Sequence, residues 1–240
     1  MASDRPTIDP TLVETCLEGV TERYGDGEGG RVTTTSSLPP SVGLKTSSAS
    51  ASATALATLD ALGLADAVDR VDLAHLVVEV TREVGVTVTG ALDDTAASLL
   101  GGLVSADNEA GRIVDRRVLG REVAILVPGE GQPSTAVDVD ALRSFAPVGE
   151  VALEQLDHDR FGLAMTLNGL AVATALGLDG TPIADGIGLV EGVSVSGTGP
   201  AVAAIGADEA VDRLASTWSS AGTVHRTSLR EMGATISEDT

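Results

Sequence analysis

One short stretch of this sequence combines residue types that proteins use to hold phosphate groups. It reads PPSVGLKTSSA at residues 39–49, and its Lys45 is the only lysine in a chain of 240 residues. A glycine followed by hydroxyl residues at the start of a helix gathers backbone N–H groups at the positive end of the helix dipole, where anions bind. Lys45 adds a positive charge, and Thr46, Ser47 and Ser48 offer hydroxyl groups to phosphate or Mg2+. The stretch therefore indicates a phosphate-binding loop, although it does not match the Walker pattern.

A flexible linker is the alternative interpretation of these residues, because TSSASASA at residues 46–53 has the composition of one. The run passes without a break into Ala55, Leu59 and Leu62, which have helical spacing. From the residues alone we favour the phosphate loop, followed by a helix over residues 47–63.

A pair of adjacent carboxylates, Asp93 and Asp94, forms the second candidate site. They lie in TVTGALDDTAASLLGG at residues 87–102, after a glycine turn and at the start of a predicted short helix. Aspartate is a favoured helix N-cap, so one of the two is expected to cap this helix. The other could act as a general base or as a metal ligand.

A third stretch, SVSGTGPAV at residues 194–202, predicts a strand that leads into a glycine-containing loop. Gly197 and Gly199 would let the backbone approach a phosphate closely, which other residues do only at steric cost. Glycines also serve in ordinary turns, so the residues alone leave both interpretations open.

The charge balance excludes several classes of partner. The chain carries 35 acidic and 15 basic residues, and its formal net charge of -20 repels nucleic acid and anionic membranes. Such scattered acidic residues are typical of proteins from a high-salt cytoplasm, where counter-ions screen the repulsion. No secretory signal or run of about 20 apolar residues is present, so we expect a cytoplasmic, halophilic protein.

Helical and strand patterns are interleaved along the chain, which predicts an α+β protein in two parts that divide near residue 120. Strands are expected over residues 29–39 and 122–129, and a strand, a loop and a second strand over 191–206. Further helices are expected over residues 72–85, within 136–178 and over 208–222, and a short helix leads into a strand within 90–107.

Taken in this order, the three stretches resemble the GHMP kinase superfamily, named for galactokinase, homoserine kinase, mevalonate kinase and phosphomevalonate kinase. Within it they are most similar to the archaeal shikimate kinases. The resemblance rests on GLKTSSA at residues 43–49, GVTVTGALDDTAASLLGG at 85–102, SVSGTGPAV at 194–202 and AMTLNG at 164–169. The lysine within the loop is unusual for the superfamily and distinguishes this branch.

The resemblance implies a two-domain GHMP kinase fold of the α+β class. Residues 1–120 would form an N-terminal βαβ-type ATP-binding domain, and residues 121–240 a C-terminal ferredoxin-like α/β sandwich. Family members begin with about 50 further residues that carry a strand and an Ala/Gly-rich motif of the substrate pocket. The chain is expected to lack this region, because it starts with a helix that would follow it.

The resemblance also implies roles for individual residues. Asp94 would be the catalytic base, Asp93 a neighbouring structural or substrate contact, and Lys45 a catalytic cation. Mg2+ would be held by Ser48 and Glu83. The residues that would bind ATP are Pro39, Pro40, Ser41, Val42, Gly43, Leu44, Lys45, Thr46, Ser47, Ser48, Ala49, Gly197, Thr198 and Gly199.

The implied activity is ATP-dependent phosphorylation of the 3-hydroxyl of shikimate, a step of chorismate and aromatic amino acid biosynthesis. Its partners would be shikimate and ATP, with no nucleic acid and no membrane. Two alternatives stay open. The chain could be a kinase for another small alcohol, such as homoserine or mevalonate, or a non-catalytic nucleotide-binding relative.

Overall fold

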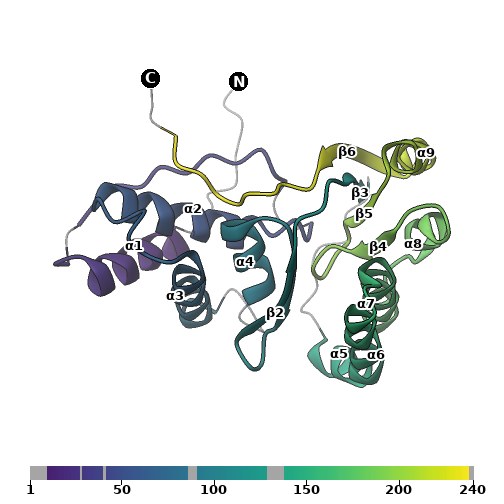
Figure 1. Cartoon of the computed structure of the whole chain (residues 1–240), viewed down its shortest axis with the longest axis horizontal. Coiled ribbons are helices and arrows are strands. Elements are labelled where there is room, and N and C mark those ends of the chain that lie inside the picture. The colour runs from purple at the N-terminus through teal and green to yellow at the C-terminus, as the bar shows by residue number, and fades with distance from the viewer. Residues whose placement is uncertain (1–9, 28, 40–41, 86–90, 129–137, 238–240) are drawn as a thin grey trace. The chain divides into compact units, whose positions relative to one another are not determined.

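The computed structural model describes residues 10–27, 29–39, 42–85, 91–128 and 138–237 (Figure 1). The chain divides into two compact units, which are treated separately below. The first consists of Met1–Ser36, Ser47–Val118 and Arg230–Thr240, and the second of Ser37–Thr46 and Leu119–Leu229. The first unit is therefore interrupted twice by segments of the second.

The described part of the first unit is a group of helices beside a β-hairpin. The helices are α1 (Thr11–Tyr24), α2 (Thr46–Ala61), α3 (Arg70–Glu83) and α4 (Leu92–Leu100). The hairpin pairs β1 (Leu103–Asp107) with β2 (Arg112–Arg117) in antiparallel register, with a bulge between Ser105 and Ala106. The predicted helices over residues 47–63 and 72–85 are thus confirmed to within two residues at each end.

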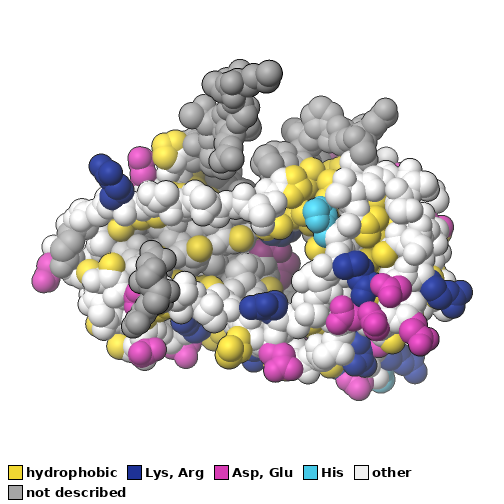
Figure 2. All heavy atoms as spheres, turned by 90° about the horizontal axis from the view of Figure 1, so that it is seen from above, with side chains coloured by type: hydrophobic (Ala, Val, Ile, Leu, Met, Phe, Trp, Pro, Cys, Tyr) yellow, Lys and Arg dark blue, Asp and Glu magenta, His cyan; other side chains and the backbone are white. Residues whose placement is uncertain are grey.

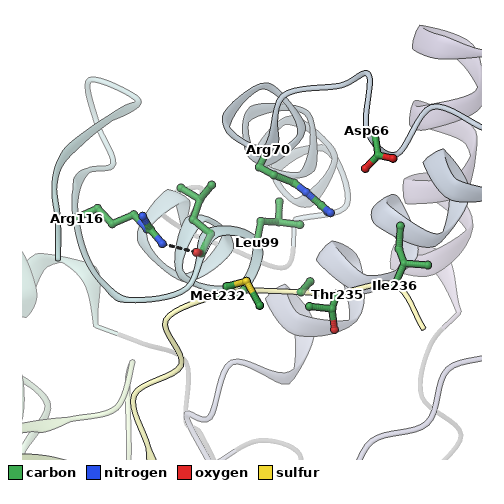
Figure 3. Close-up of a pocket in the computed structure, with 10 residues that line it drawn as sticks. Asp66, Arg70, Leu99, Arg116, Met232, Thr235 and Ile236 are labelled. Carbon is green, nitrogen blue, oxygen red and sulfur yellow. Dashed lines mark hydrogen bonds between the residues drawn. The ribbon is translucent and has the colours of Figure 1, made fainter. Parts of the chain in front are cut away.

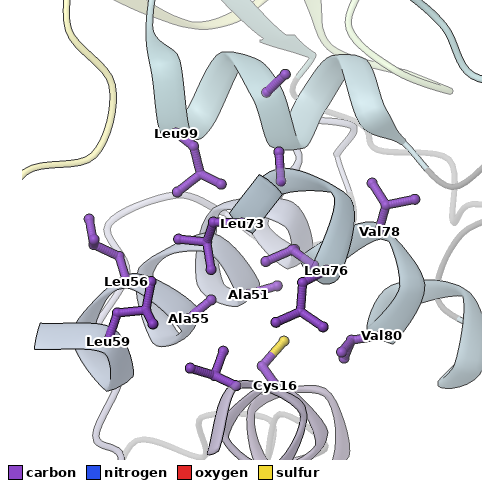
Figure 4. Close-up of a cluster of buried hydrophobic side chains, with 14 of the residues drawn as sticks. Cys16, Ala51, Ala55, Leu56, Leu59, Leu73, Leu76, Val78, Val80 and Leu99 are labelled. Atoms are coloured by element: carbon purple, nitrogen blue, oxygen red, sulfur yellow. The ribbon is translucent and has the colours of Figure 1, made fainter. Parts of the chain in front are cut away.

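Small and branched aliphatic side chains build the core of this unit, in which α1, α2, α3 and α4 meet (Figure 4). Cys16 of α1 is 1% exposed, and burial raises the pKa of its thiol to about 12. Members of the core from all four helices are Cys16, Val20, Ala51, Ala55, Leu59, Leu73, Val77, Ala96 and Leu99. Small residues let helices approach closely: a Cβ at Gly19 of α1 would lie 3.0 Å from Val80 of α3.

The Ser/Ala-rich run over residues 46–53 is the first half of α2 and not a linker. Ser48, Ala51, Ser52 and Ala55 are buried, so one side of this run belongs to the core. The linker interpretation is therefore wrong, because the small side chains serve close helix packing instead of chain flexibility.

The second unit contains a four-stranded antiparallel sheet of order β4-β5-β3-β6. Its strands are β3 (Glu122–Pro128), β4 (Gly192–Val195), β5 (Val202–Gly206) and β6 (Gly222–Ser228). Its helices are α5 (Val139–Ser144), α6 (Ala146–Asp157), α7 (Phe161–Leu176), α8 (Thr181–Gly186) and α9 (Asp208–Trp218). Figure 1 shows α6 and α7 side by side, in keeping with their packing. Helices and antiparallel strands together confirm the α+β class.

Helix α7 packs directly on β4, the strand that leads into the loop of residues 196–199. Gly162 and Gly169 lie at this contact, since a Cβ at Gly162 would overlap the carbonyl of Glu191 and one at Gly169 would lie 2.6 Å from Cα of Ser194. Gly169 ends the AMTLNG stretch noted in the sequence. That stretch therefore supports the glycine-containing loop through packing.

Charged side chains of both signs lie interspersed on the face shown in Figure 2. In the second unit Arg226 of β6 forms ion pairs with Glu122 of β3 and with Asp208 and Asp212 of α9. Among the described residues, no helix has the length and apolar character required to cross a membrane.

The strand predicted over residues 29–39 does not form. These residues have no regular structure and are mostly exposed. Their β-branched side chains favour an extended backbone, but a strand also needs a neighbouring ladder, and none of the described strands pairs with them.

Candidate active site

In the second unit, residues 42–45, here called the lysine loop, lie against residues 196–199, here called the glycine loop. The Ser196 hydroxyl donates a hydrogen bond of 2.9 Å to the carbonyl oxygen of Gly43. The backbone N–H of Ala201 donates one of 3.1 Å to the carbonyl oxygen of Val42. Two stretches that are about 150 residues apart in sequence therefore form one local structure.

Glycine is required at the contact between these loops. Gly43 has a φ of 87°, and a Cβ there would overlap the carbonyl oxygen of Ser196. Gly197 has a φ of 61°, and a Cβ there would overlap Cε of Lys45 and lie 3.0 Å from its Nζ. The glycines thus permit a close approach of backbone and lysine side chain, and are more than ordinary turn residues.

Helix α2 begins directly after Lys45, which itself has a positive φ of 58°. The first turn of α2 contains no acidic residue, so no side chain there offsets the positive end of its dipole. Ser48 is buried, Thr46 and Ala49 are half-buried and Ser47 is exposed. Lys45 therefore directly precedes the positive end of a helix dipole, the end of a helix that attracts anions.

The remaining residues predicted to bind ATP are distributed as follows. Pro39, Leu44 and Gly197 are half-buried, Gly199 is buried, and Thr198 is exposed on the glycine loop. Pro40 and Ser41 lie outside the described residues, as do residues 86–90 of the second motif.

In the first unit, Asp93 and Asp94 occupy the first turn of α4, and both are half-buried. Neither caps the helix, so the prediction that one of them does is wrong. The N-cap position belongs to Ala91, which has a φ of 51° and offers no side-chain acceptor.

The cap comes instead from Asn108, in the turn between β1 and β2. Its Oδ1 accepts hydrogen bonds from the backbone N–H groups of Leu92, at 3.0 Å, and Asp93, at 3.3 Å. Its Nδ2 donates to Oδ1 of Asp93 at 2.9 Å, and its carbonyl accepts from Arg82 of α3 at 3.1 Å. Asn108 therefore fixes both the start of α4 and the Asp93 carboxylate. Sequence reasoning missed it, because the only signal was an asparagine in a turn.

Replacing Asn108 with alanine should remove this cap and lower the free energy of unfolding by about 1 kcal/mol. Urea denaturation would measure the change. Ser98→Ala is the matched control on the same helix, since it removes only a hydrogen bond from the Ser98 hydroxyl to the Asp94 carbonyl. An equal or larger loss in the Ser98 variant would contradict the capping role of Asn108.

The two predicted metal ligands lie on different helices of the first unit. Glu83 is the last residue of α3 and is exposed, and Ser48 lies in the first turn of α2. Among the described residues, no group of three or more His, Cys, Asp or Glu side chains could hold a metal ion.

Comparisons with known proteins agree with this fold and these motifs. Residues 11–102 match the family described as GHMP kinases N terminal domain. The chain is 43% identical over 230 residues to the shikimate kinase of Halobacterium salinarum, covering 95% of this chain and 81% of the relative. It is 41% identical over 216 residues to that of Methanothrix thermoacetophila, covering 90% of this chain and 74% of the relative.

Two solved structures have a similar fold. A homoserine kinase from Cytophaga hutchinsonii has a TM-score of 0.69 at 18% identity, covering 96% of this chain and 81% of the other. A mevalonate kinase has a TM-score of 0.69 at 13% identity, with coverages of 94% and 77%. These likenesses show the fold alone.

An α+β fold of this kind, with a GHMP kinase N-terminal domain, defines a GHMP kinase. The identity to curated relatives over nearly the whole chain defines the branch. The chain belongs to the archaeal-type shikimate kinase family of the GHMP superfamily.

Proposed function

We propose that this chain transfers the γ-phosphoryl group of ATP to the 3-hydroxyl of shikimate. The observation that carries the proposal is the lysine loop, held by the glycine loop and placed directly before α2. Such a loop suits a polyphosphate, and the sequence relatives are shikimate kinases. The likeness to homoserine and mevalonate kinases concerns the fold and does not favour their substrates.

The lysine loop and the first turn of α2 would bind the ATP phosphates. Backbone N–H groups at the start of α2 would donate to phosphate oxygens, and Lys45 would neutralise charge that develops during transfer. The glycine loop would lie over the phosphates, with the exposed Thr198 as an additional hydroxyl donor. Phosphoryl transfer depends mainly on such positioning and charge neutralisation.

The residues present fit a Mg2+ ion that is carried by the nucleotide. In phosphoryl-transfer enzymes this ion takes one or two protein oxygens and otherwise phosphate and water oxygens, so a dedicated cluster of carboxylates is not needed. Ser48 offers a hydroxyl in the first turn of α2, and Glu83 offers an exposed carboxylate. When bound, the ion would offset negative charge on the phosphates.

Asp94 would accept or orient the proton of the attacking hydroxyl. Asp93 is engaged by Asn108 through both its backbone N–H and its carboxylate, which leaves it a supporting role. A carboxylate placed in this way typically contributes to the chemical step more than to binding.

A coupled assay of ADP release in molar salt tests the substrate. Shikimate, homoserine and mevalonate are compared, and turnover is expected with shikimate. Turnover on homoserine or mevalonate with none on shikimate would refute the proposed substrate. Nucleotide binding without turnover on any of the three would refute kinase activity for the chain.

A further inference from the structure

A cavity of about 500 Å³ lies in the first unit, where the start of α3 and the end of α4 meet the chain segment 232–236 (Figure 3). A second cavity of about 400 Å³, formed by residues 65–70, shares Asp66 and Arg70 with it. Asp93 and Asp94 are in the first turn of α4, whereas this cavity contacts its last turn. At 1.5 Å per residue the two ends are on the order of 10 Å apart, so the cavity is separate from the candidate catalytic carboxylates.

Tight backbone contacts fix one wall of this cavity. The N–H of Ala234 donates to the carbonyl of Ser98 at 2.8 Å, and a Cβ at Gly233 would overlap the backbone of Leu99. Arg116 donates to the carbonyl oxygens of Gly101, Leu100 and Glu231 at 2.8, 2.6 and 3.0 Å. The guanidinium of Arg116 therefore already has hydrogen-bond partners at the end of α4.

Arg70 differs from the other arginines near it. Its Nη1 is buried and has no hydrogen-bond partner, and Arg70 is one of the residues that line the cavity. In the same unit Arg112 pairs with Asp107 and Arg117 pairs with Asp115. Withdrawing part of a guanidinium from water without a hydrogen-bond partner costs folding free energy. The missing partner is unexpected, because a chain of net charge -20 is rich in carboxylates.

A carboxylate of opposite charge lines the same cavity without pairing with Arg70. Asp66 is exposed, and within the described part of the chain neither side chain forms an ion pair with the other or with a third residue. Figure 3 shows both side chains on one side of the cavity, across from Thr235 and Ile236. The cavity thus offers one positive and one negative group to a ligand.

The remaining lining is mixed, with the polar Arg116 and Thr235 beside apolar side chains. Leu99 is buried, whereas Met232 and Ile236 are 71% and 39% exposed. An inorganic anion would leave these side chains in water and would be repelled by Asp66. A ligand with a carboxylate, an ammonium group and an apolar side chain would engage all three features.

We propose that this cavity binds a free α-amino acid with an apolar side chain. Its carboxylate would pair with Arg70, its ammonium group with Asp66, and its side chain would cover Leu99, Met232 and Ile236. The cavity is open to solvent, and its volume is sufficient for a molecule of this size. The proposal does not depend on kinase activity, because binding is measured without ATP or shikimate.

Calorimetric titration of the full chain with L-leucine tests the proposal. Its analogues 4-methylpentanoate, which lacks the ammonium group, and 3-methylbutylamine, which lacks the carboxylate, are titrated in parallel. Leucine is expected to bind about tenfold more tightly than either analogue, and Arg70→Gln and Asp66→Asn are each expected to weaken leucine binding about tenfold. Arg112→Gln, an exposed arginine of the same unit, is the matched control and should leave binding unchanged.

Thermal unfolding of each variant without ligand verifies that it is folded, so that lost binding is not mistaken for lost structure. Equal leucine affinity in the wild type and Arg70→Gln would overturn the proposal. Equal affinity for leucine and 4-methylpentanoate would overturn the zwitterion assignment. Thermal unfolding is also measured with added leucine and with added chloride at the same concentration. An equal rise of the unfolding temperature with both would make the cavity an inorganic-anion site, and would also overturn the proposal.

Discussion

Replacing Lys45 with methionine is expected to lower kcat/KM for ATP by about 100- to 1,000-fold, with little change in KM for shikimate. Methionine keeps an unbranched side chain beside Gly197, whose absent Cβ leaves room for Cε of Lys45. The substitution therefore removes the charge while preserving the contact between the lysine and glycine loops. Steady-state kinetics with each substrate varied in turn would measure the effect.

Arg121→Gln is the matched control for this experiment. Arg121 is in the same unit and pairs with Glu191, and its replacement removes one positive charge at a distance from either loop in sequence. It should leave both KM values within about twofold, because exposed charges contribute little individually. An unchanged ATP dependence in the Lys45 variant, or an equal loss in the Arg121 variant, would refute the role of the lysine loop.

Replacing Asp94 with asparagine is expected to lower kcat by about 100- to 10,000-fold while binding of ATP and shikimate changes little. Asparagine preserves the size of the side chain but cannot accept the hydroxyl proton. Single-turnover kinetics would separate this effect from product release, and isothermal titration would measure binding.

Asp93→Asn is the companion variant. It keeps the backbone N–H that donates to Asn108 but alters the side-chain hydrogen bond from Asn108 Nδ2. We expect a smaller loss of kcat, since the Asp93 carboxylate is held by Asn108 and its proposed role is a supporting one. A larger loss of kcat for Asp93→Asn than for Asp94→Asn would reverse the assignment of the base.

The helices of the first unit could be predicted from the sequence because their signals are local. Leucines at helical spacing mark α2, and Gly101 and Gly102, both with positive φ, separate α4 from β1. The Ser/Ala run was ambiguous, since small residues suit both a linker and a closely packed helix. Only the packing of Ala51 and Ala55 in the core decides between these.

The strands were harder to predict, because their stability depends on distant partners. The segment 29–39 has β-branched residues and no ladder, whereas β2 and β6 are rich in charged and polar residues but pair with β1 and β3. Ladder formation, which sequence periodicity does not report, decided each case.

In the candidate site, too, local features could be predicted and long-range contacts could not. Lys45, Asp93 and Asp94 were found as residue types with suitable chemistry, and the contact of Lys45 with Gly197 follows only from the fold. Asn108 escaped notice because a capping side chain that comes from another element leaves no periodic signal. Local chemistry was therefore predictable, and its long-range support was not.

The interruption of the first unit by the second affects how the protein is made. During synthesis, the four helices and the β-hairpin of the first unit emerge before residue 119. The irregular C-terminal segment that covers the end of α4 begins only at residue 230. Until the ribosome has translated the whole of the second unit, the carbonyl of Ser98 lacks the N–H of Ala234, and Leu99 lacks the backbone of Gly233. The nascent chain must therefore hold an incomplete first unit while the second is made, so the two units cannot mature strictly one after the other.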